Sequence, residues 1–106
     1  MHLRRLQEEV ARWIEATPQG YWLPLANLAR LVEEVGELAR ALNVQHGAKP
    51  LKPGEKPPDL EQEMGDVLFT LLVLANQSGV DLERSLTDTI ARYDRRAPAG
   101  RRILEP

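Results

Sequence analysis

Cysteine is absent from this chain of 106 residues, and histidine occurs only as His2 and His46. The first absence excludes a disulfide scaffold and any cysteine-based zinc or redox site. The scarcity of histidine excludes a His-rich metal centre, so a metal here would be held by oxygen ligands. No apolar run approaches the roughly 20 residues of a membrane span, and the N-terminal residues lack the apolar core of a signal peptide. We therefore expect a cytoplasmic protein with no membrane partner.

The chain also lacks a strong net charge, which is −2 at neutral pH. A general electrostatic grip on a nucleic acid polymer is therefore not expected. Apolar residues make up 42% of the chain and charged residues 28%, the balance of an ordinary soluble globular protein. This length is enough for one domain with one modest core, and we assign residues 1–106 to a single helical domain.

Apolar residues recur at helical spacing in four segments, and no segment alternates as a strand does. The first helix is expected from Leu3 to about Ala16, because Thr17 precedes a proline and avoids the α conformation. The second is expected to begin at Pro24, which suits the first helical position. It should end near His46, just before a glycine that can cap it.

A loop rich in proline and glycine, residues 47–58, separates this half from two further helices. Asp59 is expected to cap the third helix, which should end at Ser78, and Asp81 is expected to cap the fourth. The fourth helix should end at residues 97–100. The third is apolar around most of its circumference and should be the central helix. The fold class that we predict is all-α, a four-helix bundle.

The second and third helices carry the same pattern: an acid, an apolar residue, glycine and a second acid. Glu34 and Glu37 are the acids of the first copy, and Glu63 and Asp66 are those of the second. Residues three apart are neighbours on a helix surface, so each copy forms a carboxylate pair. If the two helices pack antiparallel, the pairs can face each other across one edge of the interface.

The glycine in each copy is Gly36 or Gly65. Glycine inside a helix costs about 1 kcal/mol relative to alanine. We expect the missing side chains to allow the two helices to approach closely beside the acids.

Four carboxylates that converge on one place repel one another and raise one another's pKa. A hard divalent cation relieves that repulsion, and carboxylates and water suit Mg²⁺ or Mn²⁺. The alternative is that these acids belong only to solvated helix faces, where such spacings are common.

One further acid, Glu33, precedes the first pair. The complete pattern resembles the EExxE…ExxD signature of the MazG-like all-α nucleotide pyrophosphohydrolases. The resemblance extends over residues 20–43 and 60–82 and to the order of the helices. It implies a small single-domain member of that family, in which water attacks the α-phosphorus of a nucleoside triphosphate and pyrophosphate leaves. It also implies a homodimer or homotetramer with the active site near a subunit boundary.

The resemblance implies roles for the acids. The metal ligands would be Glu34, Glu37, Glu63 and Asp66, and they would hold Mg²⁺, or Mn²⁺ in its place. Glu33 would be the catalytic residue that orients the attacking water as a base, unless it supports a metal ligand instead.

The resemblance implies substrate contacts as well. Tyr21, Trp22 and Asn27 lie in a region that often forms the base pocket, although an aromatic residue there is also typical of a core. Arg92 and Arg96 match the family's basic-aromatic element loosely and would contact the terminal phosphates, unless they are ordinary solvated side chains. The family's asparagine two positions before Arg92 is missing here.

Three hypotheses on function follow. The first is a Mg²⁺-dependent nucleoside triphosphate pyrophosphohydrolase that removes non-canonical nucleotides. The second is a neighbouring activity on the same scaffold, a dUTP- or dCTP-specific enzyme or a phosphoribosyl-ATP pyrophosphohydrolase. The third is a helical regulatory or interaction module without turnover. The sequence leaves open both the base and the sugar of the substrate.

Overall fold

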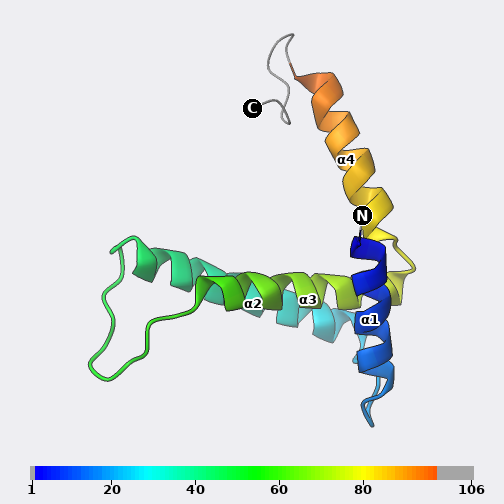
Figure 1. The fold of residues 1–106 in the computed structure, drawn as a ribbon. Coiled ribbons are helices and arrows are strands. Elements are labelled where there is room, and N and C mark those ends of the chain that lie inside the picture. The colour runs from blue at the N-terminus through cyan, green and yellow to red at the C-terminus, as the bar shows by residue number, and fades with distance from the viewer. Residues whose placement is uncertain (1, 98–106) are drawn as a thin grey trace.

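The computed structural model describes residues 2–97, which contain four α-helices and, within that range, no strand (Figure 1). The helices are α1 (Leu3–Glu15), α2 (Pro24–Gln45), α3 (Leu60–Ser78) and α4 (Leu82–Arg96). The predicted all-α class is confirmed. Part of the expected end of α4, residues 98–100, lies outside the described range. In that range no helix has the length and apolar character needed to cross a membrane.

Local sequence signals account for the helix boundaries. Pro24 is the first residue of α2, as expected. The Asp59 carboxylate accepts a hydrogen bond from the Gln62 amide at the start of α3, and Gly79 ends α3 with a left-handed φ of 68°. The Asp81 carboxylate accepts hydrogen bonds from two amides in the first turn of α4. Each of these caps satisfies backbone groups that the helix itself leaves without partners.

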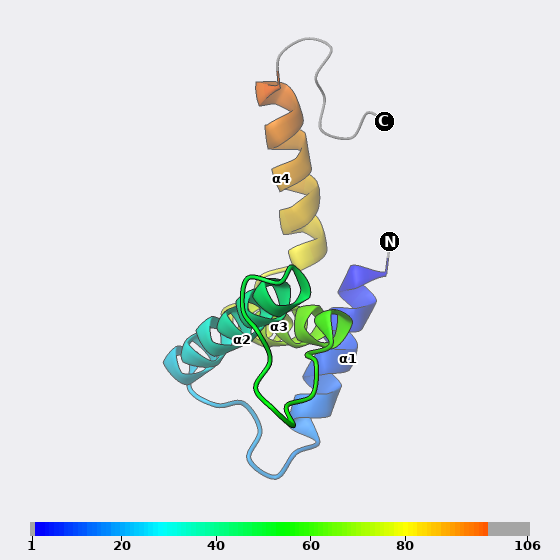
Figure 2. The ribbon, with the colours of Figure 1, turned by 90° about the vertical axis from the view of Figure 1, so that its left-hand side faces the viewer.

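The core lies between α3 and its two neighbours. α2 and α3 run antiparallel along each other, and α1 crosses α3 on another side (Figures 1 and 2). The buried apolar residues are Ala41 of α2 and Leu72, Val73 and Ala75 of α3. α3 is therefore the central helix, as its apolar circumference predicts.

α4 stands apart from this core. It rises away from the α2–α3 pair in both views (Figures 1 and 2), and its contacts are mainly with α1. Arg4 forms an ion pair with Asp81 at 2.8 Å, and the Gln7 side chain donates to the Val80 carbonyl at 2.6 Å. The radius of gyration is 17.2 Å, whereas a compact domain of this length has about 13 Å. One protomer alone is thus an open arrangement of four helices.

A broad apolar surface of α2 and α3 remains uncovered. We call it the apolar seam; its exposed members are Leu25, Leu28, Val32, Val35 and Leu42 of α2 and Met64, Leu68 and Leu71 of α3. They recur mostly at alternating steps of three and four, the spacing of a helix face that packs on another helix. The apolar stripe that the sequence shows on α2 is therefore wider than the part that α3 covers.

The expectation for the two helical glycines was wrong within one protomer. A Cβ atom added to Gly36 or to Gly65 would meet nothing within 4 Å. Both residues face open space, so neither is required for the contact between α2 and α3.

Candidate active site

Carboxylates from two helices meet at one edge of the α2–α3 interface. One oxygen from each of Glu34, Glu63 and Asp66 lies within 4.8 Å of the others. All three residues are half-buried. Antiparallel packing brings the two sequence copies face to face, because each carries its acids on the same edge. We call these three residues the acid cluster.

Glu37 lies outside the acid cluster and is exposed. Its charge nevertheless acts on Glu63, a member of the cluster. The pKa of Glu63 is raised above its ordinary value, first by burial and then by the negative charges of Asp66, Glu37 and Glu34. The positive charge of Arg40 acts in the opposite direction. The structure thus brings three of the four predicted ligands together and keeps the fourth within electrostatic range.

The donor set fits a hard divalent cation. It consists of carboxylate oxygens only, which are the ligands that Mg²⁺ and Mn²⁺ prefer. Burial is the first cause of the raised pKa of Glu63, and the neighbouring negative charges, which a cation would neutralise, are the second. These residues are therefore suited to hold such an ion together, with coordination positions left for water or phosphate oxygens.

Three other predicted residues lie away from the acid cluster. Glu33 is exposed, and one residue before Glu34 it projects from α2 about 100° around the axis. Arg92 and Arg96 are exposed on α4. Because α4 packs mainly on α1, it does not bring these arginines to the acid cluster within one protomer.

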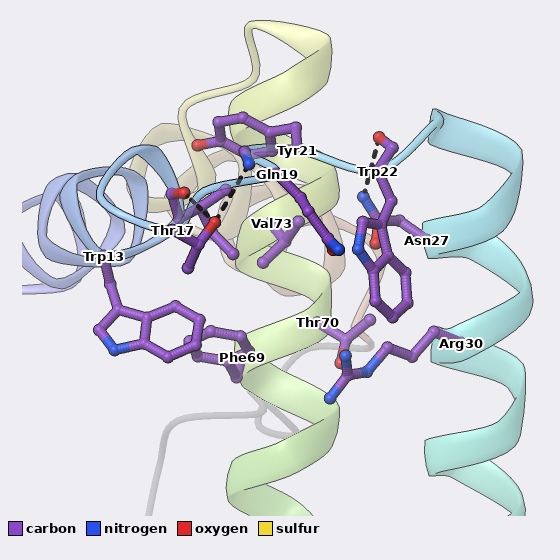
Figure 3. A pocket seen from close by; sticks show the side chains of 12 residues that line it. Trp13, Thr17, Gln19, Tyr21, Trp22, Asn27, Arg30, Phe69, Thr70 and Val73 are labelled. Atoms are coloured by element: carbon purple, nitrogen blue, oxygen red, sulfur yellow. Dashed lines mark hydrogen bonds between the residues drawn. The ribbon is translucent and has the colours of Figure 1, made fainter.

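A cavity of about 220 Å³ lies near the N-terminal end of α2 (Figure 3). We call it the aromatic pocket; its lining residues come from α1, the α1–α2 loop, α2 and α3. Tyr21, Trp22 and Asn27, the predicted base-binding residues, all line it. The other nine lining residues were not predicted from the sequence, and they include Trp13, Gln19, Arg30 and Phe69.

Aromatic rings stand on two sides of the pocket. Trp13 and Phe69 pack edge to face on one side, with ring centroids 5.7 Å apart, and Trp22 lies on the other side (Figure 3). The Gln19 side chain extends between them (Figure 3). A planar aromatic ligand with polar edges, such as a nucleobase, matches these walls.

Asn27 stabilises one wall of the pocket. It is only 5% exposed, and its amide nitrogen donates to Gln77 Oε1 at 2.8 Å. Gln77 in turn donates to the carbonyl oxygen of Trp22 at 2.5 Å. This amide pair ties the loop that carries Trp22 to α3, so Asn27 holds the pocket wall in position.

The pocket and the acid cluster are one helical turn apart on both helices. On α3, the Thr70 hydroxyl donates to the Asp66 carbonyl at 2.9 Å, and Thr70 lines the pocket. On α2, Arg30 Nε lies 3.9 Å from Glu34 Oε1, and Arg30 also lines the pocket. A ligand seated between the aromatic rings can therefore extend directly to the carboxylates.

A family comparison matches residues 23–100 to the MazG nucleotide pyrophosphohydrolase domain. The Bacillus subtilis (strain 168) protein YpjD is 43% identical over 94 residues, which cover 89% of this chain and 85% of that protein. The human protein dCTP pyrophosphatase 1 is 34% identical over 100 residues, 92% of this chain. The chain spans 58% of the length of that human protein.

Solved structures share the fold. The crystal structure of YPJD from Bacillus subtilis superposes with a TM-score of 0.77 at 42% identity, covering 87% of this chain and 94% of that one. The structure of a Bacillus-conserved MazG protein, a nucleotide pyrophosphohydrolase, superposes with a TM-score of 0.72 at 36% identity, covering 86% and 87%.

Proposed function

This chain belongs to the MazG nucleotide pyrophosphohydrolase family and is a nucleotide-hydrolysing enzyme, and we propose that it converts a nucleoside triphosphate into the monophosphate and pyrophosphate with the help of Mg²⁺ or Mn²⁺. The observation that carries the proposal is that the acid cluster and the aromatic pocket are neighbours, one helical turn apart on both α2 and α3. One place receives a base and the next receives a phosphate chain with its cation.

In this mechanism the aromatic rings of the pocket hold the base and thereby fix where the α-phosphorus lies. Glu34, Glu63 and Asp66 would hold the cation, with Glu37 beside them. When bound, the divalent ion supplies charge neutralisation on the phosphate oxygens. Glu33 would accept the proton of the attacking water, whose oxygen forms a bond to the α-phosphorus while the α–β anhydride bond breaks. Pyrophosphate carries away the electron pair of that bond.

A cytosine deoxynucleotide is the first substrate to test. The human and rat relatives named dCTP pyrophosphatase 1 match over 92% and 91% of this chain. A purely non-catalytic role as a helical interaction module is the alternative, and it predicts metal or partner binding without turnover.

We further infer that the working form is a homo-oligomer, a dimer or a dimer of dimers. The apolar seam is an uncovered face that runs along both α2 and α3. Continuous exposed apolar surface of this kind is characteristic of a contact with another protein surface. A second copy that presents the same seam would complete a bundle from two α2–α3 pairs, since symmetric contacts use one patch twice.

The decisive experiment is a panel of ribo- and deoxynucleoside triphosphates, with dUTP, dCTP, non-canonical nucleotides and phosphoribosyl-ATP included, assayed with Mg²⁺ for pyrophosphate and for orthophosphate. We expect pyrophosphate release from at least one compound. A triphosphate with a methylene α–β bridge should be inert, whereas one with a methylene β–γ bridge should still be cleaved.

Hydrolysis in ¹⁸O-labelled water tests the point of attack. The label should appear in the nucleoside monophosphate. Label in pyrophosphate, or orthophosphate with a diphosphate product, would contradict the proposed chemistry. The absence of any turnover in the whole panel would favour the non-catalytic alternative.

A further inference from the structure

α2 carries an arginine on either side of the acidic residues that it contributes to the site. Arg30 lies one turn before Glu34, and Arg40 lies one turn after Glu37. The ten-residue step from Arg30 to Arg40 corresponds to about 15 Å along the helix axis. Their surroundings differ, and the difference indicates which end of a substrate each one meets.

Arg30 belongs to the aromatic pocket. Its guanidinium carbon lies 5.3 Å from the centroid of the Trp22 ring, and its Nε is 3.9 Å from Glu34 Oε1. Among the residues that line the pocket, Arg30 is the only one that carries a positive charge (Figure 3). Its side chain is 45% exposed, so it is accessible to a ligand that enters the pocket.

Arg40 belongs to the opposite end of the acid cluster. It lies three residues after Glu37 on α2, so the two side chains are neighbours on the helix surface. Its Nη2 forms an ion pair with Glu55, from the loop between α2 and α3. A guanidinium has five N–H donors, and a bond to one carboxylate leaves others available.

We propose that Arg30 binds the α-phosphate and Arg40 binds the pyrophosphate end of the substrate, so that the nucleotide lies along α2 with one polarity. The inference rests on the proposed function and adds two phosphate-binding residues to it. Guanidinium groups bind phosphate oxygens through paired, charge-assisted hydrogen bonds. The base then lies by Trp22, and the phosphate chain crosses the acid cluster towards the loop that carries Glu55.

The interactions of the two arginines in the structure are compatible with this role. The 3.9 Å separation of Arg30 and Glu34 is an ion pair on a partly exposed helix face, and such pairs are weak. When a cation engages the Glu34 carboxylate, the guanidinium can turn to a phosphate oxygen at little cost. Arg40 can keep its bond to Glu55 and still offer donors.

Binding measurements on the intact protein separate the two ends of the substrate. The probes are deoxycytidine, dCMP and α,β-methylene-dCTP, each titrated calorimetrically in the presence of Mn²⁺. If the hydrolysis panel shows that another base is preferred, the same three compounds of that base are used. The variants are Arg30→Gln and Arg40→Gln, with Arg5→Gln as a matched control because Arg5 is an exposed helical arginine that also has a glutamate partner one turn later.

We expect Arg30→Gln to weaken dCMP binding about ten-fold, because the variant loses a hydrogen bond to the charged phosphate. Deoxycytidine has no phosphate, so its binding should be nearly unchanged. Arg40→Gln should weaken α,β-methylene-dCTP about ten-fold and leave dCMP unchanged. Arg5→Gln should bind all three compounds as the wild type does. Arg30→Lys should recover part of the dCMP affinity, because it restores the charge without the paired donors.

Glu55→Gln distinguishes phosphate binding from loop anchoring. This variant weakens the Arg40–Glu55 link but keeps the arginine, so it should retain the wild-type affinity for α,β-methylene-dCTP. If Glu55→Gln loses as much affinity as Arg40→Gln, Arg40 acts through the loop and the proposal is wrong for that end. If Arg30→Gln weakens the binding of deoxycytidine and of dCMP equally, Arg30 acts on the base and does not bind phosphate. If only this inference fails, the wild type still releases pyrophosphate in the hydrolysis panel. If the proposed function itself is wrong, the wild type releases none.

Discussion

At the scale of single residues, the acid cluster combines two properties that a metal site requires. Its carboxylates are close enough to share one ion. The pKa of Glu63 is raised first by burial and then by the charges of the neighbouring carboxylates, so both causes favour its neutral form when no cation is bound. Glu37 is exposed and lies outside the cluster, so we expect it to contribute less to metal binding than the other three acids.

Metal binding should therefore depend more on Asp66 than on Glu37. We expect Mn²⁺ or Mg²⁺ to raise the melting temperature of the wild type, because a ligand that binds only the folded state stabilises it, by about 2.7 kcal/mol at 100 times its Kd. Asp66→Asn should lose most of that gain and Glu37→Gln less, as measured by thermal denaturation with and without metal. Glu61→Gln, at an exposed position of α3, is the control. A wild-type protein that does not respond to millimolar Mn²⁺ would argue against a metal site.

Glu33 should separate catalysis from metal binding. If it orients the attacking water, Glu33→Gln should lower turnover on the order of 100-fold or more, the range of general-base contributions. The same variant should keep the metal-dependent rise in melting temperature, because Glu33 lies outside the acid cluster. Steady-state kinetics and thermal denaturation of the same preparations measure both effects. Equal loss of metal stabilisation in Glu33→Gln and Glu34→Gln would show that Glu33 is a ligand.

At the scale of elements, α4 depends on one carboxylate for its start. The pKa of Asp81 is lowered, chiefly by the hydrogen bond from the Arg84 amide, and also by the ion pair with Arg4. Asp81 therefore joins the first turn of α4 to α1, the helix on which α4 mainly packs.

The lowered pKa of Asp81 predicts how stability changes with pH. A carboxyl group whose pKa is lower in the folded state binds fewer protons there than in the unfolded state. Its contribution is present above the unfolded pKa and is lost as the pH falls through the folded pKa. We expect Asp81→Asn to lower the melting temperature at neutral pH, and the difference from the wild type to shrink below about pH 4. Asp88→Asn, at an exposed position of the same helix, is the control, and a pH-independent difference for Asp81→Asn would contradict the prediction.

At the scale of the whole molecule, the large radius of gyration and the exposed apolar seam both reflect an open protomer with a small core. A chain of this length that leaves a row of valine and leucine side chains exposed on its two longest helices has more apolar surface than its own fold covers. The surroundings of Gly36 and Gly65 are also open, which leaves room for another helix at those positions.

A charge in the apolar seam should disrupt self-association. Val32 is 65% exposed, so Val32→Glu removes no contact within the protomer core. We expect the wild type to sediment as a dimer or tetramer and Val32→Glu to sediment as a monomer, since the interface would bury an unpaired carboxylate. Arg5→Glu introduces the same side chain at an exposed position of α1 and should leave the assembly unchanged. A wild type that is monomeric at all concentrations would refute the inferred assembly.

The sequence by itself determined the helices and the two carboxylate pairs from which the acid cluster is drawn. Proline at the start of α2, the aspartate caps of α3 and α4 and the glycine after α3 act on neighbouring backbone groups, so their effect can be read locally. The spacing of Glu63 and Asp66 likewise follows from helix geometry alone.

Only the tertiary structure decided the pocket, the partners of the arginines and the direction of α4. Trp13 and Phe69 come from helices far apart in the sequence, and their contact depends on the angle at which α1 crosses α3. Arg40 meets Glu55 because the loop between α2 and α3 brings Glu55 back to α2. Arg92 and Arg96 lie away from the acid cluster because α4 packs mainly on α1. Helical periodicity shows which residues share a face of one helix, but it does not state which other element covers that face. That choice is made by the packing of side chains from distant segments, and in this protein it leaves the apolar seam exposed.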